Sequence, residues 1–197
     1  MIFNCKEPIM QIMSYVLSLA GLVSMILASL VKGQNMKKIL LFVFMGNILV
    51  ATSYLLAGNG INGAASCYLG GLQSIINYFY DAKMKPLPTW LIALYAVAFV
   101  ALNLAVGGVS ALGILAIVAS LTFIMCIGQK NGKKYRFWTL VNMGLWCLYD
   151  ICSMSFGALI THGIQIVFAV AGMIIHDREK QGTESAVPAT ENLSVNA

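Results

Sequence analysis

The run ILLFVFMGNILVATSYLLA, residues 39–57, contains no charged side chain and directly follows Lys37 and Lys38. A helix needs about 20 mostly apolar residues to cross the hydrocarbon core of a bilayer, so this run is long enough to span a membrane. Because the run is continuously apolar, it lacks the alternating pattern of a strand in a membrane β-barrel. It therefore predicts a membrane-spanning helix and an all-α fold.

Six further runs share this character along the chain of 197 residues. The composition agrees, because 59% of the residues are hydrophobic and only 10% are charged, against about 25% charged in an average soluble domain. We predict one transmembrane domain over residues 1–177, followed by a disordered cytoplasmic tail over residues 178–197. The predicted spans are residues 9–31, 39–57, 63–80, 89–106, 109–127, 137–155 and 158–175.

Basic residues gather in alternate connections between these spans. The first, third and fifth connections and the C-terminal tail carry 11 of the 12 Lys and Arg residues, and the other connections carry none. This assignment places Arg136 in the fifth connection. The positive-inside rule then puts the N-terminus outside and the C-terminus in the cytoplasm. Topology accounts for the net charge of +5, and no nucleic-acid partner is expected.

The chain also repeats itself at a spacing of about 95 residues. Three matches occur in the same order relative to the spans: GQNMKK (33–38) with GQKNGKK (128–134), Asn47 and Tyr54 with Asn142 and Tyr149, and Asp81 with Asp177. The first three helices therefore correspond to the last three. Four helices separate corresponding members, so both triads cross the membrane in the same direction. The predicted architecture is two parallel three-helix repeats, 9–80 and 109–175, joined by a linker helix over 89–106.

This three-plus-one-plus-three plan resembles the SWEET, PQ-loop and PnuC-like (MtN3-like) transporter superfamily. More closely, GNILVATSYLLAGNGINGAAS (46–66) and LWCLYDICSMSFGALITHG (145–163) resemble the two halves of YgjV-type bacterial inner-membrane proteins. The resemblance covers residues 9–176 and implies a carrier fold in a bacterial inner membrane. Two departures matter: the chain contains no Pro-Gln dipeptide, and neither 9–31 nor 109–127 contains the proline that serves the sugar and PQ-loop branches as a hinge.

Polar residues inside the spans are the candidate functional residues, because an ionisable group at the bilayer centre costs about 2.5 to 3.5 kcal/mol on insertion scales. Asn142, Trp146 and Asp150 lie at i, i+4 and i+8 and share one helix face. His162 and Gln165 share a face of the last helix. The helical rise puts Asp150 and His162 at similar depth, close enough for a hydrogen bond or ion pair. The alternative is that both side chains simply reach the outer interface.

The first repeat supplies three amides, Asn47, Gln73 and Asn77, and Tyr149 stands beside Trp146 as an aromatic wall. Amides facing one axis suit a neutral solute, and the aromatic rings could stack on it. The alternative for the amides is hydrogen bonding between helices, and the alternative for the aromatic rings is packing. The nine residues together form the predicted substrate site.

These features predict a carrier, facilitative or proton-coupled, for a small polar metabolite such as a nucleoside, vitamin precursor or sugar. Alternating access between the two repeats would move the solute. The alternative is a sensor or assembly partner that keeps the carrier fold without transporting. We expect no enzyme, cofactor or metal, because no span carries ligands at metal spacing and no Ser or Cys has a base beside it. The expected partners are the lipid bilayer and the solute, with the protein as a monomer or homodimer.

Overall fold

Seven α-helices make up the described part of the chain, which comprises residues 6–31, 35–57, 61–152 and 156–177 of a computed structural model. The helices are α1 (Lys6–Leu30), α2 (Met36–Ala57), α3 (Ile61–Ala82), α4 (Thr89–Gly107), α5 (Ala111–Ile127), α6 (Gly132–Cys152) and α7 (Phe156–Asp177). No strand occurs in these ranges, so the all-α class and the number of helices are confirmed there. The predicted tail over 178–197 lies outside the described residues.

Both copies of the repeated motif contain an asparagine at a helix start. The Asn35 side-chain oxygen accepts a hydrogen bond from the Lys38 backbone N–H at the start of α2, and the Asn131 side-chain oxygen accepts one from the Lys133 N–H at the start of α6. A side-chain oxygen in this position satisfies a backbone donor that has no partner within the helix. The motif therefore fixes where the second and sixth helices begin.

Arg136 corrects the predicted start of the sixth helix. Since Asn131 caps α6, the helix begins at Gly132, and Arg136 belongs to its second turn rather than to the preceding connection. Its side chain is only 1% exposed, and Nη1 donates to the carbonyl of Val31 at the end of α1 at 3.3 Å. Charge counting treated this arginine as a topology signal, but it is a buried link between helices.

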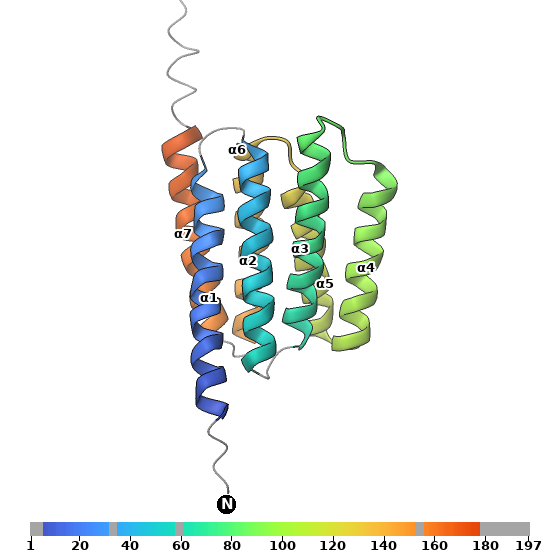
Figure 1. The fold of residues 1–197 in the computed structure, drawn as a ribbon. Coiled ribbons are helices and arrows are strands. Elements are labelled where there is room, and N and C mark those ends of the chain that lie inside the picture. The colour runs from blue at the N-terminus through green and yellow to red at the C-terminus, as the bar shows by residue number, and fades with distance from the viewer. Residues whose placement is uncertain (1–5, 32–34, 58–60, 153–155, 178–197) are drawn as a thin grey trace, which may run out of the picture.

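The helices pack as two layers of three, with α4 at one edge (Figure 1). The first layer holds α1, α2 and α3, and the second layer holds α7, α6 and α5 in the same spatial order. The layers meet along two edges, where α1 contacts α7 and α3 contacts α5, and α4 packs on both α3 and α5. The arrangement leaves the middle of the bundle lined by both layers.

One end of the bundle is closed by a hydrophobic cluster. This end, here called the basic end, carries Lys37, Lys38, Lys83, Lys85, Lys130, Lys133 and Lys134 on or beside the helix termini. The cluster joins α1 and α2 of the first layer to α5 and α6 of the second, with Ile39, Val43, Ile127 and Tyr135 among its members. Close packing of such side chains excludes water from the basic end of the interior.

The outer surface of the bundle is apolar, with exposed side chains such as Leu19 on α1, Val97 on α4 and Val167 on α7. Among the described helices, α1, α2 and α4 are long and apolar enough to cross a membrane by length and composition, and α5 and α7 contain shorter apolar stretches. Helices α3 and α6 are more polar, but many of their polar residues, including Gln73 and Asn142, are buried. Apolar residues outside and polar residues inside are the pattern of a helix bundle in lipid.

Candidate functional site

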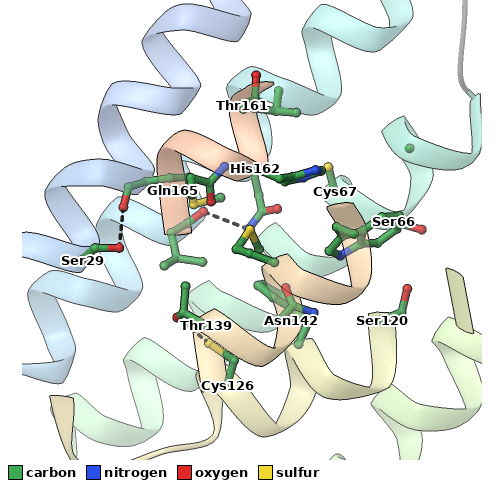
Figure 2. A pocket seen from close by; sticks show the side chains of 18 of the residues that line it. Ser29, Ser66, Cys67, Ser120, Cys126, Thr139, Asn142, Thr161, His162 and Gln165 are labelled. Atoms are coloured by element: carbon green, nitrogen blue, oxygen red, sulfur yellow. Dashed lines mark hydrogen bonds between the residues drawn. The ribbon is translucent and has the colours of Figure 1, made fainter. Parts of the chain in front are cut away.

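A cavity of about 210 Å³ lies between the two layers, and every helix of both layers contributes to its wall. Figure 2 shows side chains from both layers around it, including Ser29 and Cys67 from the first and Asn142, His162 and Gln165 from the second. Five predicted site residues line the cavity: Asn47, Trp146, Asn142, His162 and Gln165. The structure thus brings residues of both predicted repeats to one enclosed space.

Asn142 is the most constrained polar group of the wall. Its amide nitrogen donates to the Ala119 carbonyl at 2.6 Å and to Thr122 Oγ1 at 3.0 Å, both on α5. The side chain is 1% exposed, and no described group donates a hydrogen bond to its Oδ1. This oxygen is fully buried as well as unpaired, and a buried acceptor without a donor costs free energy.

Asp150 and His162 form the contact that their spacing predicts. Asp150 Oδ2 lies 2.6 Å from His162 Nδ1, and the Asp150 side chain is only 3% exposed. Asp150 is therefore enclosed by protein rather than turned toward the outer interface. His162 reaches the cavity, whereas Asp150 stands behind it and fixes the ring through Nδ1. Asp150 is a positioning residue for His162 in this arrangement.

Trp146 packs on the same histidine. Its ring is stacked on the His162 ring with centroids 6.0 Å apart, and Tyr149 meets it edge-on at 5.4 Å. Trp146 lines the cavity, but one face of its ring is covered by His162. Tyr149 does not line the cavity and instead supports Trp146. The predicted aromatic wall is therefore one tryptophan held between two neighbours.

Two predicted amides of α3 lie away from the cavity wall. Asn77 donates to the Ile127 carbonyl at 3.1 Å and accepts from the Tyr95 hydroxyl at 3.4 Å, so it joins α3 to α5 and α4. Gln73, one turn earlier, is 1% exposed, and its amide atoms have no hydrogen-bond partner among the described residues. Asn77 thus has the interhelical role that was the alternative to ligand binding.

Much of the polar wall consists of small side chains that sequence reasoning did not select. They are hydroxyls and thiols from four helices: Ser29, Ser66, Cys67, Ser120, Cys126 and Thr139. Such residues occur throughout apolar helices, so none stands out by type. Helical spacing was the signal that could have found them. Thr139 lies about one turn before Asn142, so the two share a helix face, and Ser29 shares a face with Ser18, another residue of the wall, three turns earlier.

The wall carries little charge. Its residues include no Lys, Arg, Asp or Glu, and His162 is the one histidine among them. Within the described ranges, no three His, Cys, Asp or Glu side chains come together in a way that could hold a metal ion. The site offers hydrogen bonds and apolar contact rather than ionic binding.

The family model for Imp-YgjV, described as bacterial inner membrane protein, matches residues 12–180. The chain belongs to this family. Membership confirms the resemblance to YgjV-type proteins and identifies the chain as a bacterial inner membrane protein. No curated protein and no solved structure matches it. For this Imp-YgjV protein, an argument about function therefore has to come from the cavity itself.

Proposed function

We propose that the protein is a membrane carrier for a small polar metabolite, working by alternating access between its two layers. The observation that carries this proposal is the cavity between the layers, whose mainly apolar wall carries polar side chains from both layers. An apolar cavity with a few polar groups is the usual design of a site for a small molecule. Clefts between structural halves near the membrane midplane are where carriers bind substrate.

The helix order supports the division into two equivalent halves. Exchanging the layers would place α1 on α5, α2 on α6 and α3 on α7. The same exchange turns the α1–α7 edge into the α5–α3 edge, and both edges are in contact. This is the arrangement that two parallel three-helix repeats require, with α4 as the linker. A relation to SWEET, PQ-loop and PnuC-like carriers is part of this proposal.

Contacts between the two layers at the basic end favour a carrier state that is closed at this end. There, Arg136 of the second layer binds the Val31 carbonyl of the first, and Asn77 of the first layer binds the Ile127 carbonyl of the second. By the positive-inside rule this end faces the cytoplasm and the N-terminus lies outside. Opening toward the cytoplasm would then break both bonds and part the hydrophobic cluster.

Uptake into proteoliposomes tests the proposal directly. Purified protein is reconstituted and offered radiolabelled nucleosides, vitamin precursors and sugars, with empty liposomes as the control. We expect saturable uptake of at least one of these solutes. Uptake is also compared at several pH values for the wild type and for Asp150→Asn. Identical pH profiles would remove Asp150 from any role in proton coupling. Solute binding without flux would instead favour a sensor built on the carrier fold.

A further inference from the structure

A groove runs between α1 and α2 at the basic end and shares no residue with the cavity between the layers. The two helices lie side by side in the first layer (Figure 1). Leu27 of α1 and Leu41 of α2 line the groove and are 43% and 44% exposed, so it opens on the outer surface of the bundle. Since α1 ends at Leu30 and α2 begins at Met36, the groove lies where lipid chains give way to headgroups.

The polar and apolar residues of this groove are separated along the helix axis. On α2, Lys38 precedes Leu41 by three residues and Phe42 by four, so the three side chains share one helix face. The helical rise puts both apolar side chains about 4.5 to 6 Å further from the basic end than Lys38. On α1, Leu27 likewise lies about one turn before the end of the helix at Leu30. The groove is therefore basic at its rim and apolar below.

Two hydrogen bonds hold the walls of the groove. The Val31 carbonyl accepts from Arg136 Nη1 at 3.3 Å, and the Phe42 carbonyl accepts from Ser24 Oγ at 2.9 Å. The second bond joins α1 directly to α2. A groove whose walls are already fixed loses little conformational freedom when a ligand enters it.

The rim of the groove offers hydrogen-bond donors and a positive charge. Asn35 Oδ1 accepts from the Lys38 backbone N–H at 3.3 Å, so the amide N–H bonds of Asn35 are what this side chain can still offer to an anion. The Lys38 ammonium adds three donors, and both side chains are exposed. No Asp or Glu is among the described residues that line the groove. A phosphate group at the rim would meet donors and a cation without a competing carboxylate.

We propose that this groove binds one molecule of an anionic phospholipid, with the phosphate at Lys38 and Asn35. One acyl chain lies against Leu27, Leu41 and Phe42. Any apolar helix surface in a bilayer is covered by lipid, but a groove with a cation at its rim also distinguishes lipids by the charge of the headgroup. A zwitterionic lipid carries its own cation beside the phosphate, and a soluble phosphate lacks the chain. The inference does not depend on the proposed carrier function.

Native mass spectrometry of the purified full-length protein in detergent counts bound lipids and tests this inference. The probes are dioleoylphosphatidylglycerol, which is anionic, and dioleoylphosphatidylcholine, which has the same chains without net charge. Glycerol 1-phosphate serves as an anion without chains. We expect phosphatidylglycerol to bind at least about fivefold more tightly than phosphatidylcholine, the factor that one lysine near a membrane surface contributes. Equal binding of the two lipids, or displacement of phosphatidylglycerol by glycerol 1-phosphate, would overturn the inference on the wild-type protein alone.

Lys38→Gln tests the rim of the groove, and Lys83→Gln is its control. Both lysines are exposed at the basic end, but Lys83 does not line the groove. Lys38→Gln should weaken phosphatidylglycerol binding about fivefold and leave phosphatidylcholine binding unchanged, whereas Lys83→Gln should change neither. Equal losses in the two variants would mean that the lipid responds to the overall charge of the basic end, and the groove would not be its site.

Leu41→Trp tests the contact with the chain, and Leu55→Trp is its control. Both leucines are exposed on α2, but Leu55 lies near the opposite end of the helix. The larger ring fills the groove only in Leu41→Trp, so this variant should lose at least about fourfold in phosphatidylglycerol affinity, the loss expected for one methylene of the chain. Unchanged binding would remove the acyl chain from the groove. A dimer that forms without lipid and disappears in Leu41→Trp would assign the groove to a second copy of the chain and overturn the lipid site.

Discussion

Gly172 on α7 lies at a close approach between the two layers, on the α1–α7 edge. A Cβ at this position would overlap the backbone carbonyl oxygen of Ser29 on α1 and would lie 3.0 Å from Arg136 Cδ. The carbonyl cannot rotate away as a side chain can, so Gly172→Ala must push α1 and α7 apart. Gly163, on the same helix, has open space where its Cβ would lie, and nothing is within 4 Å of that position.

The comparison of these two substitutions isolates the contact. Gly→Ala in a helix interior gains up to about 1 kcal/mol from helix propensity in either place. Overpacking costs about 1 to 3 kcal/mol, and only Gly172→Ala incurs it. The two variants should therefore differ by about 1 to 3 kcal/mol, which corresponds to a difference of about 2 to 12 °C in unfolding temperature for a chain of this size.

The assay is the fraction of protein that stays monodisperse on size exclusion after heating in detergent. Gly144→Ala on α6 serves as a second control, since its added Cβ also meets nothing within 4 Å. Gly172→Ala should unfold at the lowest temperature of the three variants. If it is as stable as Gly163→Ala, the helices are not in backbone contact at this edge, and the description of the layers is wrong there.

Three further predictions concern buried polar groups and topology. In the same heating assay, the Asp150→Ala variant should be less stable than the Asp150→Asn variant by about 1 to 3 kcal/mol. Only the alanine variant leaves His162 Nδ1 without its side-chain acceptor. Equal stabilities would contradict a structural role for the pair. Asn77→Leu should destabilise the protein by about 1 to 3 kcal/mol, because Asn77 loses its hydrogen-bond partners. Gln73→Leu, on the same helix face, should leave the stability of the protein unchanged or raise it, because Gln73 has no such partner among the described residues. The reverse order of stabilities would contradict both assignments. In a variant whose one cysteine is Cys152, which is exposed near the end opposite the basic end, a membrane-impermeant maleimide should label intact cells from outside; labelling only after lysis would reverse the proposed orientation.

The helices could be predicted from the sequence because most are long, largely apolar runs, and the lipid requirement for satisfied backbone groups leaves helices as the structure for such runs. The Asp150–His162 contact could also be predicted, because it depends on two neighbouring helices and on the fixed rise per residue. Both inferences are local. Neither needs knowledge of which distant helices meet.

The roles of Asn77 and Arg136 could not be predicted for the opposite reason. Asn77 finds its partner 50 residues along the chain, and Arg136 finds Val31 at a separation of 105 residues. Their types suggested a ligand contact and a loop charge, but the packing of distant helices gave them structural bonds. The hydroxyls and thiols of the cavity were missed because residue type carries no signal when Ser, Thr and Cys fill so many helix positions.

The two ends of the proposed carrier are held by contacts of different kinds, and this difference determines which can act as gates. At the basic end, the acceptors are the Val31 and Ile127 carbonyls at the ends of α1 and α5, where the last helical carbonyls have no partner within their own helix. Water can take the place of either donor once the layers part, so the net cost of breaking is about 1 kcal/mol for the Asn77 bond and about 1.5 to 3 kcal/mol for the bond from the charged Arg136.

The Asp150–His162 pair cannot act in this way by itself. Both residues belong to the second layer, so rocking one layer against the other leaves the pair intact. A gate at this end needs a partner from the first layer, and Tyr54 of α2 lines the same cavity as His162. Tyr54 and Tyr149 are also the aromatic pair of the sequence repeat. The pair of Asp150 and His162 therefore orients one wall of the site, and Tyr54 belongs to the layer that would move relative to it.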